Sequence, residues 1–166
     1  MIYRREEDMY PHIKSWLERE LKNNIRGVER IHVYITPRTS ITKLLLNERL
    51  TPHFSNEYLT YDIKVDITGI IIRGGRGELV FVECKLGKIS LREFSQLLGY
   101  SVVAKPKYSL ILSPMGVSDS LRKLISSFGR TDIIEYSKGR KIALAKWDGN
   151  KMDIDRTTII PPGWSF

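Results

Sequence analysis

The chain has 166 residues, of which 42% are apolar and 28% are charged, a composition typical of folded globular proteins and not of disordered ones. No stretch has the apolar length that a membrane span needs, the charged start lacks the apolar core of a signal peptide, and a single cysteine excludes an intramolecular disulfide. We therefore expect one cytoplasmic domain over residues 1–166, with no membrane partner.

The charge balance favours a polyanionic partner. The sequence holds 27 Lys and Arg residues against 19 Asp and Glu residues, which gives a net charge of +8. Such an excess suits nucleic acid, although the basic residues are spread along the chain without a dense run. The alternative interpretation is a basic protein with an ordinary solvated surface.

The first third of the chain predicts a helix, a strand and an insertion. Residues 5–22 have apolar side chains at helical spacing, and Pro11 falls in the first turn, where a missing N–H is tolerated. Residues 28–35 alternate as a strand does, through Ile31, Val33 and Ile35. Residues 37–60 are polar and contain two prolines, so we expect an insertion with one short helix.

Two strands joined by a glycine-rich turn are predicted next. In residues 61–72 the apolar side chains Ile63, Val65, Ile67 and Ile71 are expected on one face, and Asp62, Lys64, Asp66 and Thr68 on the other. Residues 73–77 form the turn, and residues 78–86 form the second strand. The glycines lead into a strand and lack the ending of a phosphate-binding loop, so a β-hairpin is the better interpretation.

The rest of the chain continues the alternation of helices and strands. Its predicted elements are a helix over 90–104 with Ser90 as N-cap, a strand over 108–112, a helix over 118–129, and short strands over 133–136 and 142–147. The extended tail carries Trp164 and Phe166, which dock on the body or on a second subunit. The fold class is therefore α/β, with a mixed sheet, a core of order α-β-β-β-α-β over about residues 5–113, and peripheral elements over 114–166.

Residues 80–87, VFVECKLG, place charges within an apolar strand. Strand alternation puts Val80, Val82 and Cys84 on one face, so Glu83 and Lys85 extend the other face beyond Leu79 and Phe81. Burying charge is costly unless it is paired or bound to a metal ion. The strand end is therefore either exposed or functional.

The hairpin can bring Asp66 beside this acid–base pair, depending on register. Carboxylates from Asp66 and Glu83, with several waters and substrate phosphates, are ligands that Mg²⁺ prefers, and the backbone carbonyl of Cys84 is a further candidate ligand. A bound metal lowers the pKa of a water and neutralises charge on a phosphodiester, while Lys85 positions that water or stabilises the transition state. Cys84 itself is expected to be a small core residue.

Asp66, sixteen intervening residues and then Glu83-Cys84-Lys85 resemble the motif of the PD-(D/E)XK nuclease superfamily. The resemblance covers about residues 5–113 and implies a restriction-endonuclease-like fold and a metal-dependent nuclease. Val65 stands where the motif has proline, which leaves Asp62 as a rival acid. Asp66 is preferred because it leads into Ile67-Thr68-Gly69, a run common after the acid of this family.

Two further residue sets are similar to motifs of the same superfamily. Gln96 and Tyr100, at i and i+4 on one helix face, resemble the QxxxY motif of its RecB-type branch, which implies roles for both in holding substrate. The alternative is an exposed Gln96 and a core Tyr100. Family members often carry a glutamate at the metal on the first helix, and Glu6 is preferred over Glu7, although both also suit a helix N-terminus.

The resemblance implies a nuclease that cleaves DNA in repair, recombination or defence, with Mg²⁺ as cofactor and Mn²⁺ as a possible substitute. The expected site comprises Asp66, Glu83, Lys85, Gln96 and Glu6. Phosphate contacts are expected from the flanking Lys88, Arg92, Lys105 and Lys107, with Tyr100 as a further nucleic-acid contact. The alternatives are a non-catalytic nucleic-acid-binding module on the same fold and a Holliday-junction resolvase, which would act as a homodimer.

Overall fold

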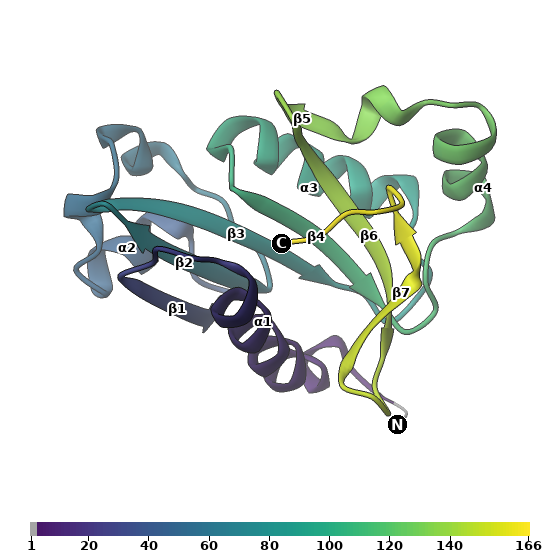
Figure 1. Ribbon diagram of the computed structural model, residues 1–166, viewed down its shortest axis with the longest axis horizontal. Coiled ribbons are helices and arrows are strands. Elements are labelled where there is room, and N and C mark those ends of the chain that lie inside the picture. Colours follow the sequence, from purple (N-terminus) through teal and green to yellow (C-terminus); the bar gives the residue numbers. More distant parts are fainter. Residues whose placement is uncertain (1–2) are drawn as a thin grey trace.

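A computed structural model describes residues 3–166 and shows an α/β architecture built on one mixed seven-stranded sheet (Figure 1). The strand order is β1-β2-β3-β4-β6-β5, with β7 paired to β6. The strands are β1 (Arg30–Ile35), β2 (Ile67–Arg73), β3 (Arg76–Cys84), β4 (Tyr108–Ser113), β5 (Glu135–Ser137), β6 (Arg140–Asp148) and β7 (Asp153–Ile160). Strands β1 to β3 pair antiparallel, whereas β3, β4 and β6 run parallel.

Helices cover both faces of this sheet. They are α1 (Tyr10–Asn24), α2 (Ile41–Asn47), α3 (Leu91–Ala104) and α4 (Asp119–Arg122), with a π-helical turn at Lys123–Ser127. Shorter 3-10 turns span Glu6–Asp8, Thr51–His53, Asn56–Thr60 and Thr131–Ile134. The predicted order of helix, three strands, helix and strand is therefore present as α1-β1-β2-β3-α3-β4, with α2 as the short helix expected between β1 and β2.

Two apolar clusters, one on each side of the sheet, make the core. On one side Trp16 and Leu17 of α1 join Val80 and Val82 of β3. On the other side α2 and α3 supply Leu45, Phe94 and Leu97, which join Phe81 of β3. Strand β3 therefore lies in the middle of the molecule. Its side chains point alternately to the two faces of the sheet, so they contribute to both clusters. Of the helices in residues 3–166, none is both long and apolar enough to cross a membrane.

The predicted strand over 61–72 is wrong in its first half. Residues 61–66 do not join the sheet ladder. The carbonyls of Tyr61 and Ile63 instead accept hydrogen bonds from the start of α2, as from Ile41 N–H to the Ile63 carbonyl (2.9 Å). A bend at Asp66 then changes which face of the sheet the odd-numbered side chains point to. Val65 lies in the cluster under α2 and α3, and Ile67 lies in the cluster under α1, so the two do not share a face as the alternation predicted.

Several boundaries also differ from the sequence expectation. The helix α1 starts at Tyr10 and not at residue 5, because a separate 3-10 turn, Glu6–Asp8, precedes it and Asp8 caps that turn by accepting from the Arg5 N–H (3.0 Å). The predicted helix over 118–129 is confined to α4 and the π-helical turn. Of residues 133–136, the first two belong to a 3-10 turn, and β5 begins at Glu135.

The C-terminal third contributes more to the sheet than expected. Strand β6 pairs with β4, and its Leu144 and Trp147 are buried, so part of the region 114–166 belongs to the central sheet. The tail was predicted to be only an extended end, but its residues up to Ile160 belong to strand β7, which pairs with β6. Docking of the tail on the body is confirmed, because the Phe166 ring centroid lies 5.1 Å from that of Tyr108 and 5.8 Å from that of Trp16.

Candidate active site

The candidate site lies where the β2–β3 hairpin opens. The tight turn at its other end contains Gly74 and Gly75, both with positive φ, as a two-residue hairpin turn requires. The ladder ends at the pair Ile67 and Val82, so one further step in the same register sets Asp66 opposite Glu83. Register and turn together bring the two predicted acids to the same end of the β2–β3 pair.

Strand β3 presents Glu83 and Lys85 as its alternation predicted. Val80, Val82 and Cys84 are buried in the cluster under α1, and Leu79 and Phe81 are buried in the opposite cluster. The Cys84 thiol is fully buried, and this burial raises its pKa, which keeps it a neutral core group as expected. The charged pair thus continues a face that is apolar up to Phe81.

Asp66 is buried, with 7% of its surface exposed, and both of its carboxylate oxygens accept hydrogen bonds. The Tyr10 hydroxyl donates to Oδ1 (2.7 Å), and the Cys84 backbone N–H donates to Oδ2 (2.8 Å). The Thr36 N–H donates to the Asp66 carbonyl (2.8 Å), which fixes the backbone at the bend. These contacts from α1, β3 and the end of β1 hold the carboxylate in one orientation.

Lys85 lies between two carboxylates. Its Nζ is 3.1 Å from Oε1 of Glu83 and 3.4 Å from Oε2 of Glu6, which comes from the 3-10 turn before α1. Glu7 points elsewhere, toward the exposed guanidinium groups of Arg5 and Arg38. The structure therefore brings Glu6, and not Glu7, to the lysine.

The site is electrostatically short of positive charge. Burial, followed by the charge of Asp66, raises the pKa of Glu83 from its ordinary 4.5 to about 7. Burial also raises the pKa of Asp66, against the opposing effect of its two hydrogen bonds. Burial alone would lower the pKa of Lys85, but the charges of Glu83, Glu6 and Asp66 and the hydrogen bond to Glu83 together raise that pKa, so the ammonium stays charged. One buried and one half-buried carboxylate, both with raised pKa values, favour the approach of a further cation.

The donor set suits a hard divalent cation in part. In a strand the N–H and C=O of one residue point to the same edge, so the Cys84 carbonyl points toward Asp66, as its N–H does. Carboxylates of Asp66 and Glu83 with this carbonyl are oxygen ligands of the kind Mg²⁺ takes, the rest being waters and substrate oxygens. No cluster of three or more His, Cys, Asp or Glu side chains able to hold a metal occurs within residues 3–166. The third predicted metal ligand, Glu6, contacts Lys85 in this structure, and its role at a metal ion stays a prediction.

The rival acid, Asp62, lies outside this site. It is exposed on the segment that pairs with the start of α2, and it precedes the bend that turns Asp66 toward Tyr10. The choice of Asp66 over Asp62, made from the sequence, therefore agrees with the geometry.

Gln96 and Tyr100 lie one turn apart on α3, as predicted, and contact each other. Gln96 Nε2 donates to the Tyr100 hydroxyl (3.4 Å); Gln96 is exposed and Tyr100 half-buried against the core. Within the described residues neither has a recorded contact with Asp66, Glu83 or Lys85. Their predicted role in holding substrate stays a prediction.

Two residues of the site were missed by the sequence analysis. Tyr10 donates to Asp66, and its own pKa is raised by burial and then by that hydrogen bond, so the phenol remains a donor. Glu93, in the first turn of α3, has its pKa lowered chiefly by the Ser90 hydroxyl and also by the charge of Lys85. The capping pattern of Ser90 and Glu93 was visible in the sequence, whereas nothing local marked Tyr10.

The four basic residues expected around the site divide into two groups. Lys88 and Arg92 are exposed near the C-terminal end of β3, and Lys88 pairs with Asp119 (3.7 Å). Lys105 and Lys107 precede β4, and the Lys107 N–H donates to the Leu79 carbonyl, so they lie toward the other end of β3. The prediction that all four flank the carboxylates is wrong for Lys105 and Lys107.

The assembled site gathers three carboxylates, from Glu6, Asp66 and Glu83, around the single ammonium of Lys85. Oriented carboxylates beside a lysine can bind a cation and hold a water or an anionic oxygen next to it. Comparison of the chain with protein-family models, with curated proteins and with solved structures finds no match in any of the three.

Proposed function

We propose that the protein is a Mg²⁺-dependent nuclease that hydrolyses phosphodiester bonds of DNA. The observation that carries the proposal is the position of Asp66 and Glu83 at the ends of neighbouring strands, with the Lys85 ammonium 3.1 Å from Glu83. The motif resemblance to the PD-(D/E)XK superfamily and the order α1-β1-β2-β3-α3-β4 support it. A restriction-endonuclease-like fold is part of the same proposal.

In this proposal each residue has a defined task. Asp66, Glu83 and the Cys84 carbonyl would hold the metal ion, while Tyr10 and the Cys84 N–H orient Asp66. When bound, Mg²⁺ supplies a water of lowered pKa and neutralises charge that develops on the phosphate. Lys85 donates hydrogen bonds to the attacking water or to a phosphate oxygen, and Glu6 holds the lysine in place.

Charge supports DNA as the substrate. The net charge of +8 attracts a polyanion despite the local cluster of carboxylates, and exposed Lys88 and Arg92 lie on the side where β3 ends. Phosphate contacts of this kind position a nucleic acid without selecting a sequence. The proposal therefore extends to repair, recombination or defence roles that need little sequence specificity.

The test is a cleavage assay on labelled single-stranded, duplex, flapped and four-way-junction DNA, with and without Mg²⁺ or Mn²⁺. We expect cleavage that requires the metal and that is lost in Glu83→Gln and in Lys85→Met. Matched controls remove one exposed charge of each sign elsewhere, in Asp132→Asn and Lys22→Gln. Salt-sensitive DNA binding without cleavage in the wild type would instead support a non-catalytic binding module, and cleavage confined to junctions by a dimer would support a resolvase.

A further inference from the structure

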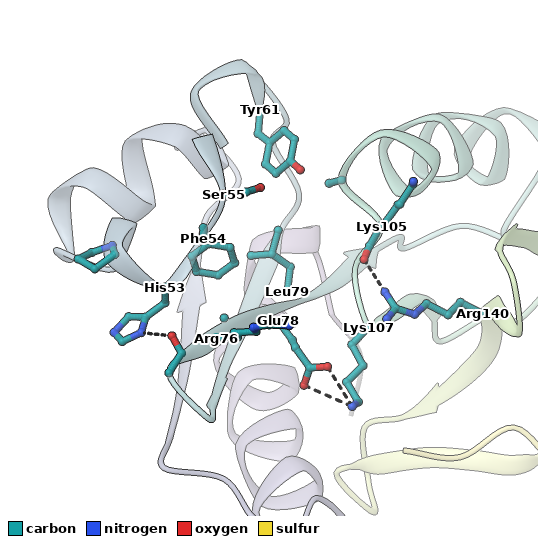
Figure 2. Close-up of a pocket in the computed structure, with 14 residues that line it drawn as sticks. His53, Phe54, Ser55, Tyr61, Arg76, Glu78, Leu79, Lys105, Lys107 and Arg140 are labelled. Carbon is teal, nitrogen blue, oxygen red and sulfur yellow. Dashed lines mark hydrogen bonds and ion pairs between the residues drawn. The ribbon is translucent and has the colours of Figure 1, made fainter. Parts of the chain in front are cut away.

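A second concave surface lies at the opposite end of β3 from the carboxylates. It is a cavity of about 470 Å³, bounded by the β2–β3 turn, by residues 52–55 and Tyr61, and by the C-terminal end of α3 (Figure 2). We call it the hairpin cavity. Its volume is within the range of small-ligand and ligand-group sites.

The hairpin cavity is basic. Its lining includes four Lys or Arg side chains against one carboxylate, that of Glu78, which leaves a net charge of +3; the four are Arg76, Lys105, Lys107 and Arg140. A concave surface with one dominant sign of charge concentrates ligands of the opposite sign. The cavity therefore favours an anion.

Two of the four cations are already engaged. Lys107 Nζ lies 3.2 and 3.3 Å from the two carboxylate oxygens of Glu78. Arg140 Nη1 donates to the Lys105 carbonyl (2.8 Å; Figure 2) and to the Pro106 carbonyl (3.3 Å), and so fixes the end of α3. These contacts build the wall of the cavity.

The other two cations have no such partner. Across residues 3–166, neither the Arg76 guanidinium nor the Lys105 ammonium makes a recorded hydrogen bond or ion pair. Arg76 opens strand β3, and Lys105 ends α3 in a left-handed conformation (φ 47°), so both are carried by well-defined backbone. They are the groups that remain able to bind an anion.

An aromatic wall adjoins these cations. The Phe54 ring packs on Gly77, where a Cβ would clash with it, and Tyr61 and Leu79 complete the apolar part of the lining. Cations beside an aromatic surface are the combination that binds a nucleotide strand through phosphate and base. The hairpin cavity therefore suits nucleic acid better than a bare inorganic ion.

Strand β3 connects the hairpin cavity to the candidate active site. Leu79 lines the cavity, and Glu83 is four residues further along the same strand and on the same face. At 3.3 Å per residue this separation is about 13 Å. The phosphates of one DNA strand are spaced by at least the axial rise of about 3.4 Å, so a separation of this size spans a few phosphates at most.

We propose that the hairpin cavity binds backbone phosphates of the DNA strand, through Arg76 and Lys105, a few nucleotides from the phosphodiester held at Asp66 and Glu83. The inference rests on the proposed function and adds a substrate contact to it. It also gives Lys105 a role in spite of its distance from the carboxylates.

The test measures equilibrium binding of labelled duplex DNA by fluorescence anisotropy in EDTA, over a range of salt concentrations. The double variant Arg76→Gln/Lys105→Gln removes the two unpaired cations, and Lys22→Gln/Arg26→Gln removes one Lys and one Arg at the end of α1, on the other face of the sheet. Each lost phosphate contact lowers the slope of log K against log salt by about 0.9. We expect the cavity variant to lose about 1.8 of this slope and about tenfold in affinity, and the control to keep both.

Three outcomes would overturn the inference. They are an unchanged slope in the cavity variant, an equal loss in the control, and wild-type protein without salt-dependent DNA binding. A parallel calorimetric titration with deoxyadenosine monophosphate identifies the source of the phosphate. Loss of mononucleotide binding with an unchanged DNA slope would assign the cavity to a free nucleotide instead.

Because binding is measured without a divalent metal, this experiment is independent of cleavage. A wild-type protein that binds DNA with the expected change of slope but never cleaves it would refute the nuclease and retain the cavity as a DNA contact. A protein that cleaves DNA, but whose cavity variant keeps the wild-type salt slope, would support the nuclease and refute the cavity as a DNA contact.

Discussion

Each end of strand β3 carries a half-buried glutamate, and the two glutamates have opposite electrostatic surroundings. At the start of the strand, Glu78 lies 3.0 Å from Arg73 and 3.2 Å from Lys107, so one carboxylate has two cations. At the end of the strand, Glu83 shares the single ammonium of Lys85 with Glu6 and faces the charge of Asp66. The negative charge of Glu78 is therefore balanced by neighbouring cations, whereas the negative charge around Glu83 is not.

The difference separates a structural ion cluster from a candidate catalytic one. Compensated charges at a surface contribute modestly to stability and ask for no ligand. Uncompensated carboxylates held together in a buried place raise the free energy of the folded protein until a proton or a metal ion neutralises them. The excess of negative charge around Glu83 therefore favours the binding of a proton or of a further cation at this end of the strand.

The largest effect that would test this comparison is on catalysis. We expect Glu83→Gln or Lys85→Met to lower the rate of Mg²⁺-dependent DNA cleavage by about 10²–10⁴-fold, because a positioned charged group is removed from the reacting centre. Single-turnover cleavage of the preferred DNA measures the loss. A rate within threefold of wild type in either variant, with the fold intact by circular dichroism, would remove these residues from the mechanism.

The next effect is on stability and has an unusual sign. The pKa of Glu83 is raised in the folded protein from 4.5 to about 7, so the folded state binds the proton more tightly than the unfolded state does. The protonated Glu83 carboxyl therefore contributes to the stability of the folded state. This contribution is fully present below about pH 4.5 and is lost as the pH rises through about 7. At pH 8, metal-free Glu83→Gln should be more stable than wild type by about 1–2 kcal/mol.

Urea unfolding in EDTA at pH 8 and at pH 5 measures this difference. The advantage of Glu83→Gln should shrink at pH 5, where the wild-type carboxyl already carries its proton. A variant that is less stable than wild type at pH 8 would contradict the assignment of Glu83 as an uncompensated charge.

Metal binding should offset the loss of folding stability that the charged carboxylates cause at pH 8. In wild type, Mg²⁺ or Mn²⁺ at pH 8 should raise the midpoint of thermal unfolding, since a ligand bound at 100 times its Kd stabilises by about 2.7 kcal/mol. The same addition should leave the midpoint of Glu83→Gln unchanged. Differential scanning calorimetry makes the comparison, and an equal shift in both proteins would show that the metal binds elsewhere.

A smaller effect is expected from Tyr10, which acts only through Asp66. Tyr10→Phe removes the 2.7 Å hydrogen bond but keeps the ring, so we expect cleavage to fall by about tenfold, corresponding to about 1–1.5 kcal/mol. A positioning role predicts weaker Mg²⁺ binding in a calorimetric titration, in parallel with the lower rate. Loss of thermal stability with unchanged metal affinity would make Tyr10 a purely structural residue.

The smallest effect belongs to the compensated end of the strand. Glu78→Gln removes the partner of Arg73 and Lys107, and we expect a loss of stability of at most about 1 kcal/mol. The sign is opposite to that of Glu83→Gln at pH 8, and urea unfolding of both variants side by side checks it. Stabilisation by both substitutions would abolish the contrast between the two ends.

The part of the site that could be predicted from the sequence is the part set by strand periodicity. The alternation of β3 placed Glu83 and Lys85 on one face, and the glycine turn implied a hairpin that could bring Asp66 beside them. Both signals are local, since they depend on residues two apart or on a turn of two residues. They therefore needed no knowledge of the tertiary structure.

The remaining features depend on contacts between distant segments. Tyr10 meets Asp66 across 56 residues, and no spacing rule connects an aromatic residue on a first helix to an acid on a later strand. Residues 61–65 alternate like a strand, yet the carbonyls of Tyr61 and Ile63 accept hydrogen bonds from α2 and not from a neighbouring strand. Lys105 and Lys107 are near Lys85 in the sequence, but the parallel crossover through α3 carries them to the other end of the sheet.

The aromatic contact between Phe166 and Trp16 has a consequence for how the protein is made. About 150 residues separate the two rings along the chain, and Phe166 also packs on Tyr108. A ribosome adds roughly 5–20 residues per second, so about 8–30 s pass between the synthesis of Trp16 and that of Phe166. During translation that surface is exposed to chaperones and to other nascent chains, and the Trp16 environment closes only when residues 164–166 have emerged.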